Sequence, residues 1–162
     1  AGFFIIFEHH FDVGDVVEIN GFKGRVIDIG LKTTRVQNWK NDIKIFSNGN
    51  ITESINYSLA DSFAVIEFGI SYGSDIQRTL DLLEQELPKH MDKLPDLIEI
   101  PKVLGVTDLA SSSVNIRVIA KTNPETQYGV ERKLRQAIKE LLDENGIEIP
   151  FPQVVVHEAK KN

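Results

Sequence analysis

The sequence predicts an α+β protein in which a small, strongly bent β-barrel precedes a split βαβ sandwich. Short β-branched runs between Phe11 and Ile51 surround a turn framed by Gly21 and Gly24, which is typical of a small barrel. From Ser74 onward, apolar residues recur at helical spacing instead. A valine-rich stretch then follows the last helical pattern. These observations indicate two folded parts and a separate tail.

The barrel strands are expected at Asp15–Ile19, Gly24–Ile29, Thr33–Val36 and Ile43–Phe46. Alternation puts Val17 with Ile19, Thr34 with Val36 and Ile43 with Ile45 on a common face, opposite Arg35 and Lys44. The segment from Asn38 to Asp42 is the expected hairpin tip. It carries Trp39, the only tryptophan, which we expect to pack on its own domain rather than at a subunit contact. Residues Ser47 to Asn50 form a turn signal.

The second part begins with an apolar strand, Phe63–Ser71, which leaves the barrel. A helix starting at Ser74, with Asp75 in its first turn, carries an apolar stripe and ends at Pro88. Strands follow at Lys102–Val106 and Val114–Ala120, and a second helix spans Thr126–Asn145 before Gly146. The order strand, helix, strand, strand, helix, strand predicts a ferredoxin-like sandwich. The two apolar helix stripes are Ile76, Leu80, Leu83 and Leu87, and Val130, Leu134, Ile138 and Leu141.

The tail reads Pro150-Phe151-Pro152-Gln153 and then three valines. The prolines predict a stiff, extended entry into a strand that is buried on both faces. Two partners are open to this strand. It pairs with the chain's own sheet, which the residues alone favour, or several copies pool one strand each in a closed barrel.

The apolar run from Gly2 to Phe7 reaches about 9 Å as a helix, against the roughly 30 Å of a bilayer core, so it does not span a membrane. It lacks the basic region and cleavage site of a signal peptide. We interpret it either as the start of a fragment cut from a longer protein or as a core segment of a complete soluble one.

Composition excludes several classes of function. The formal net charge of −6 is unfavourable for a generic phosphate-backbone interface. The absence of cysteine excludes disulfides, thiol catalysis and thiolate metal sites. Adjacent His9 and His10 rarely chelate one ion, and no nucleophile elbow is present. We therefore expect no cofactor, no metal and no catalytic residue.

The residues between Phe11 and Ile51 resemble the β domain of the small-conductance mechanosensitive (MscS-type) channel family. The tail from Ile149 to Gln153, with Val156 and His157, is similar to the entry into that family's final strand. Ser47 differs from the proline that the family usually has, and His9-His10 differs from its often basic junction. The matching β-domain positions are Phe11, Gly14, Asp15, Val17, Ile19, Gly21, Gly24, Val26, Thr34, Asn48 and Gly49.

The resemblance implies a role for each segment. Residues 1–10 would be the cytosolic end of the pore-lining helix, 11–62 the β domain, 63–150 the ferredoxin-like domain and 151–162 the strand and tail of an intersubunit barrel. The implied site residues are Phe3, Phe4, Ile5, Ile6 and Phe7 at the pore-helix end, His9, Phe11, Val13 and Gly14 at the elbow, and Val154, Val155 and Val156 in the barrel.

The same resemblance implies the cytosolic vestibule of a cell-membrane channel that releases ions and small osmolytes on hypo-osmotic shock. The implied partners are sister copies in a homoheptamer, the membrane through helices expected before Ala1, and the permeating solutes, with no nucleic acid. The alternative is a soluble module, an Sm-like barrel fused to a ferredoxin-like domain, that binds RNA or a small effector. Its acidic balance and the lack of an aromatic, Arg-rich strand face argue against RNA.

Overall fold

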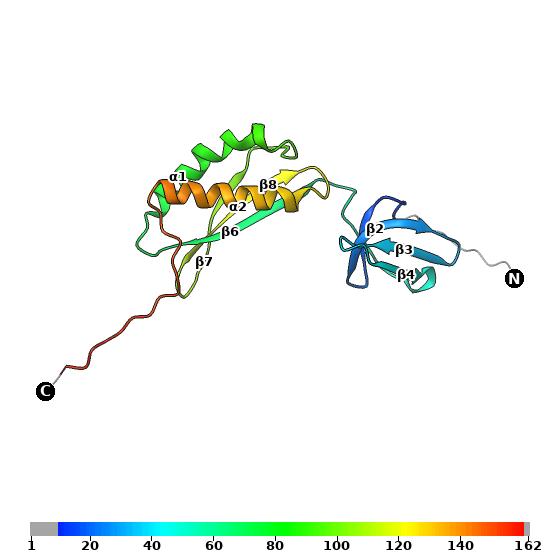
Figure 1. The fold of residues 1–162 in the computed structure, drawn as a ribbon, viewed down its shortest axis with the longest axis horizontal. Helices are drawn as coiled ribbons and strands as arrows, with labels where there is room; N and C mark the ends of the chain where they lie inside the picture. Colours follow the sequence, from blue (N-terminus) through cyan, green and yellow to red (C-terminus); the bar gives the residue numbers. More distant parts are fainter. Residues whose placement is uncertain (1–9, 161–162) are drawn as a thin grey trace. The chain divides into compact units, whose positions relative to one another are not determined.

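The computed structural model describes residues 10–160, and the chain divides into a first unit that ends at Asp61 and a second unit that begins at Ser62 (Figure 1). Each unit has its own cluster of buried apolar side chains. The fold is α+β, with two antiparallel sheets and two α-helices.

The first unit is one five-stranded antiparallel sheet in the order β4-β3-β2-β1-β5. The sequence does not predict β5, because two residues are too short to show alternation. This strand pairs with Val17 and Glu18 of β1 and adds a neighbour on the far side of that strand. The strands are β1 (Val16–Ile19), β2 (Phe22–Ile29), β3 (Thr33–Gln37), β4 (Ile43–Ser47) and β5 (Ile55–Asn56).

The core of this unit confirms two of the three predicted strand faces and contradicts the third. Val17, Ile19 and Val36 are fully buried, but Ile43 and Ile45 are 53% and 58% exposed. The register explains the difference, because Phe46 lies directly opposite Thr34 and therefore takes the buried face of β4. Lys44 shares that face, and its ammonium lies 5.5 Å and 5.2 Å from the ring centroids of Phe22 and Phe46. Its charged end thus lies against two aromatic rings, on the face opposite to Ile43 and Ile45.

The turn after β4 is held by Asn48, which begins a short 3-10 helix (Asn48–Asn50). Its backbone N–H donates to Lys32 O at 2.9 Å, and its side-chain amide donates to Gly30 O at 2.8 Å. Its side-chain oxygen accepts from Thr34 Oγ1 at 2.7 Å. The turn is therefore fastened to the β2–β3 connection although Ser47 replaces the expected proline.

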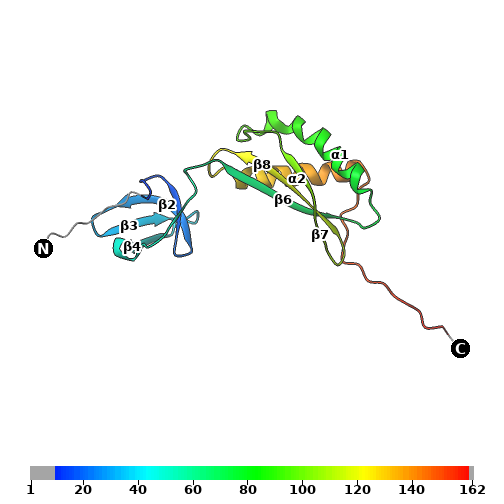
Figure 2. The same ribbon diagram turned by 180° about the vertical axis from the view of Figure 1, so that it is seen from behind.

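The second unit is a three-stranded antiparallel sheet in the order β6-β8-β7, and both helices lie on one face of it (Figures 1 and 2). Alternate residues of β8, from Val114 to Thr122, are buried toward the helices. Its elements are β6 (Ser62–Ile70), α1 (Ile76–Glu86), a 3-10 helix (Leu87–Lys93), β7 (Lys102–Leu109), β8 (Val114–Thr122) and α2 (Gln127–Glu144).

The ends of both helices agree with the sequence prediction, except for the position of Asp75. Asp75 is the N-cap of α1, where its side chain accepts from Arg78 N at 3.0 Å, and does not belong to the first turn. Pro88 lies at the start of the 3-10 helix and ends α1 as predicted. Gly146 has φ +67° after α2, and Ile147 N donates to Leu142 O at 2.9 Å, which closes a Schellman-type cap.

The buried stripe of α2 is as predicted, with Val130, Leu134, Ile138 and Leu141 all buried. In α1, Leu83 and Leu87 are fully buried and Leu80 packs against the core, but Ile76 is partly exposed. Thr79 is buried in its place and donates its hydroxyl to Asp75 O at 2.8 Å. The first turn of α1 is thus more polar on its inner side than the sequence indicates.

The sheet of the second unit lacks the terminal strand that the predicted order requires. After α2 the chain instead crosses the end of β6, where Ser71 N donates to Glu148 O at 3.0 Å. A side chain of α2 is hydrogen-bonded to the free edge of β6, since Val65 N donates to Glu131 Oε1 at 3.1 Å. Pro150 and Pro152 have no N–H to offer to a ladder. Within the described part of the chain, residues 150–160 belong to no sheet.

Candidate assembly surfaces

The elbow that enters the first unit, Phe11 to Asp15, is a closed turn rather than a flexible linker. Gly14 has φ +100°, a conformation that L side chains rarely adopt, and its N–H donates to Val26 O at 2.8 Å. Val26 N donates back to Asp15 O at 2.8 Å. Phe11 packs against the core of the first unit, whereas the Val13 side chain is 58% exposed. The elbow is therefore attached to β2.

The predicted site residues Phe3, Phe4, Ile5, Ile6, Phe7 and His9 lie outside the described residues. Of the predicted elbow residues, Phe11 and Gly14 both touch the first unit, and Val13 points away from its core. The role of this whole set in a pore remains a prediction.

Asp15, Arg25 and Asn56 were not among the predicted site residues. Their side chains make hydrogen bonds that join the elbow to segments distant in sequence. Asp15 Oδ2 accepts from Asp12 N at 3.0 Å and from Asn56 Nδ2 at 3.0 Å. The guanidinium of Arg25 donates to Gly14 O. The sequence predicts a bend at Gly14 and Asp15. No local pattern predicts that Asn56 is the hydrogen-bond partner of Asp15.

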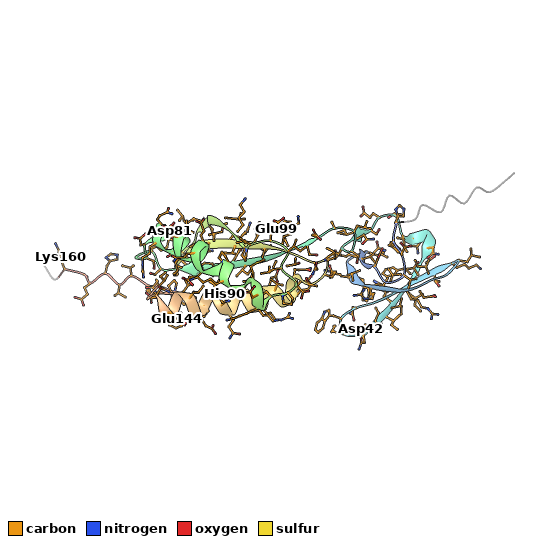
Figure 3. The ribbon with its side chains drawn as sticks, turned by 90° about the horizontal axis from the view of Figure 1, so that it is seen from above. Asp42, Asp81, His90, Glu99, Glu144 and Lys160 are labelled. Carbon is orange, nitrogen blue, oxygen red and sulfur yellow. The ribbon has the colours of Figure 1, made fainter. Side chains whose placement is uncertain are left out.

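The tail leaves the second unit as an extended and exposed segment (Figures 1 and 2). Val154, Val155 and Val156 are 85%, 76% and 81% exposed. Its entry is tied to the β7–β8 turn, since Gln153 N donates to Ser112 Oγ at 3.1 Å. In Figure 3 the Lys160 label marks the far end of this tail. An unpaired run of three exposed valines is a surface that association would cover.

The tip of the β3–β4 hairpin presents a second exposed apolar surface. Trp39 is 89% exposed, which contradicts its expected packing on its own domain. The loop beneath it is ordered by Asn38, whose Oδ1 accepts from Lys40 N at 3.0 Å and from Asp42 N at 2.9 Å. Figure 3 labels Asp42 in this loop. The ring is thus displayed on an ordered loop, and Ile43, the first residue of β4, is exposed as well.

The described residues show no arrangement for metal chemistry. Among residues 10–160, no group of three or more histidine, aspartate or glutamate side chains is placed to hold a metal ion. In that same range, no helix combines the length and the apolar character that crossing a lipid bilayer requires.

Two family models together match most of the chain. The model of the mechanosensitive ion channel β domain matches residues 1–59. The model of the C-terminal region of the mechanosensitive ion channel MscS matches residues 64–149. The boundary between the two matches falls where the chain divides into its two units.

Individual relatives agree with these matches. A small-conductance mechanosensitive channel of Caldanaerobacter subterraneus subsp. tengcongensis is 37% identical over 164 aligned residues, which cover 100% of this chain and 58% of the relative. A channel of the same name from Helicobacter pylori is 33% identical over 157 aligned residues, covering 93% of this chain and 56% of the relative. The chain thus spans little more than half the length of these relatives.

Solved structures share the fold. The crystal structure of Helicobacter pylori MscS in its closed state superposes with a TM-score of 0.80 at 26% identity, over 94% of this chain and 61% of that one. Arabidopsis thaliana MSL1 has the same fold, with a TM-score of 0.62 at 17% identity over 88% of this chain and 53% of that one. The family is one of channels and not of enzymes. On the evidence of its two units and of both family models, the chain belongs to the MscS family of mechanosensitive ion channels.

Proposed function

We propose that this chain forms the cytosolic vestibule of a mechanosensitive channel that releases ions and small osmolytes after hypo-osmotic shock. In this proposal, membrane tension shifts a two-state equilibrium toward an open state, and the two units of several copies surround the path of the solutes. Family membership supports the channel role. The heptamer, the cytosolic location and the permeating solutes are part of the proposal.

The observation that carries the proposal is the exposed tail. Val154, Val155 and Val156 extend beyond a unit whose own core is already covered by two helices. One strand from each copy would close a parallel barrel around a symmetry axis, which leaves no free edge and turns alternate side chains of the valine run into the barrel. Val154 to Val156 are therefore proposed as the intersubunit barrel strand.

The other predicted residues are assigned to the same arrangement as part of the proposal. Phe3, Phe4, Ile5, Ile6 and Phe7 are proposed as the cytosolic end of the pore-lining helix. His9, Phe11, Val13 and Gly14 are proposed as the elbow below it, supported by the bonds of the Gly14 turn to β2. Trp39 becomes a proposed contact between subunits, supported by its exposed position on an ordered loop.

Replacing Val155 by aspartate tests the tail. The substitution places one carboxylate from every copy at the same level of the closed barrel, where like charges on neighbouring strands repel each other. We expect the wild-type chain to associate reversibly as its concentration rises in analytical ultracentrifugation. We expect Val155→Asp to remain monomeric over the same range.

The matched control is Leu31→Asp, which places the same charge at an exposed apolar position of the first unit. It should associate like the wild type. A wild-type chain that stays monomeric at every concentration would contradict the pooled barrel. In the full-length protein, the channel role itself is tested by patch-clamp recording under membrane stretch and by survival of osmotic downshock in cells without other such channels.

A further inference from the structure

We propose that Ser112 is a positioning residue for the tail, because its hydroxyl fixes the direction in which the three valines leave the second unit. This role rests on the proposed intersubunit barrel, whose strands Ser112 orients before the copies meet. Ser112 lies in the turn between β7 and β8 and was not among the predicted site residues.

The second unit holds the start of the tail at two points. Ser71 N, just after β6, donates to Glu148 O at 3.0 Å. Further along the tail, Gln153 N donates to Ser112 Oγ at 3.1 Å. In Figures 1 and 2 the tail passes beside the β7–β8 turn, where Ser112 lies. Two points fix the direction of a segment, whereas a single point would let it swing.

The segment between these two points is stiff. Pro150 and Pro152 each restrict the backbone φ to about −65°. The side-chain amide of Gln153 donates to Phe151 O at 2.8 Å. Because the Gln153 peptide is held by Ser112 and follows a stiff segment, Val154 starts from one position and in one direction.

The turn that carries Ser112 is itself braced. Ala110 N donates to Ser113 O at 2.9 Å, which closes the turn. From the loop between β6 and α1, the Tyr72 hydroxyl donates to Ala110 O. Ser113 Oγ donates to Asn115 Oδ1 at 2.8 Å. The Ser112 hydroxyl therefore meets the tail from an ordered support.

The same bond determines where an intersubunit ladder begins. Pro150 and Pro152 have no N–H, and the N–H of Gln153 is bonded to Ser112. The N–H groups that follow belong to the valines. The ladder of the proposed barrel therefore starts at Val154.

A tail that already points in one direction loses less freedom when copies associate. Ordering a flexible segment at an interface costs free energy, and a preformed segment avoids part of that cost. Without the Ser112 hydroxyl, the tail samples several directions, and the tail of every copy has to be ordered during assembly. Ser112 thus strengthens association from a position outside the barrel.

The first readout is the direction of the tail in the monomer, at a protein concentration below the onset of association. The chain has no cysteine, so Lys133→Cys on α2 and Val154→Cys on the tail each accept one spin label. Double electron–electron resonance measures the distance between the two labels. We expect a narrow distribution with Ser112 and a broad one with Ser112→Ala. Ser112→Thr keeps the hydroxyl and should restore the narrow distribution.

The second readout is association of the unlabelled chain in analytical ultracentrifugation. We expect Ser112→Ala to raise the concentration of half-association about threefold to tenfold, as the loss of one hydrogen bond per copy implies. Ser112→Thr should return it toward the wild-type value. Ser111→Ala is the matched control, because it removes an exposed hydroxyl from the same turn. It should leave both readouts unchanged.

The positioning role is overturned by a label distribution of the same width with Ser112 and with Ser112→Ala. It is also overturned by a Ser112→Ala chain that has the broad distribution but associates like the wild type. Stronger association of Ser112→Ala has the same meaning, because the bond would then compete with the ladder for Gln153 N–H. A wild-type chain that stays monomeric at every concentration refutes the proposed barrel instead, and the label distances then decide the positioning role by themselves.

Discussion

At the scale of the residue, Gly24 lies where the backbone of β3 leaves no room for a side chain on β2. A Cβ built on Gly24 would lie 2.4 Å from Gln37 O and 2.6 Å from Gln37 C, both in the backbone of β3. Backbone atoms have no side-chain rotamer through which to yield, so β2 and β3 would have to separate. We expect Gly24→Ala to lower the free energy of unfolding of the first unit by about 1–3 kcal/mol, as overpacking does, in chemical denaturation.

Gly49→Ala is the control for this substitution, since a Cβ at Gly49 meets nothing within 4 Å. Its stability should stay close to that of the wild type. Equal losses for the two variants would show that the close approach of β3 at Gly24 does not set the cost.

Single residues also show where sequence reasoning succeeds and fails. Val17, Ile19 and Val36 were assigned correctly because alternation within one strand decides their face. Ile43 and Ile45 were assigned to the wrong face, because the face of β4 is decided by the pairing of Phe46 with Thr34 in another strand. The Asp15–Asn56 bond has the same non-local origin. Local periodicity carries no information on such pairs.

At the scale of the element, the free edge of β6 is controlled by a side chain from α2. Glu131 Oε1 accepts from Val65 N at 3.1 Å, where a further strand would otherwise pair. Glu131→Ala should leave that N–H to solvent or to another strand. We expect faster amide exchange at Val65 in NMR spectra and more self-association through the edge.

Glu140→Ala is the matched control on the same helix, where the Glu140 carboxylate accepts from the exposed side chain of Gln136. Its Val65 amide should exchange at the wild-type rate. A Val65 amide that is unaffected by Glu131→Ala would show that the edge is protected in another way.

The elements themselves were predicted where a pattern extends over several turns or pairs. The stripe of α2 and the cap at Gly146 were predicted because both signals are local. The two-residue β5 was missed, since it exists only through its pairing with β1. The strand expected after α2 is absent from the sheet of the second unit, because its prolines lack donors and Glu131 already meets the neighbouring edge.

At the scale of the whole molecule, the two separate cores predict two unfolding transitions. Each unit buries its own apolar cluster, around Ile19 in the first and around Leu134 in the second. A small unit buries a smaller fraction of its surface, so the first unit should unfold at the lower temperature in calorimetry. Ile19→Ala and Leu134→Ala each remove a fully buried side chain and should cost about 2–5 kcal/mol in their own unit.

The two variants serve as controls for each other. Ile19→Ala should move only the lower transition and Leu134→Ala only the upper one, with amide signals in each unit as separate reporters. If either variant shifts both transitions together, the units unfold cooperatively.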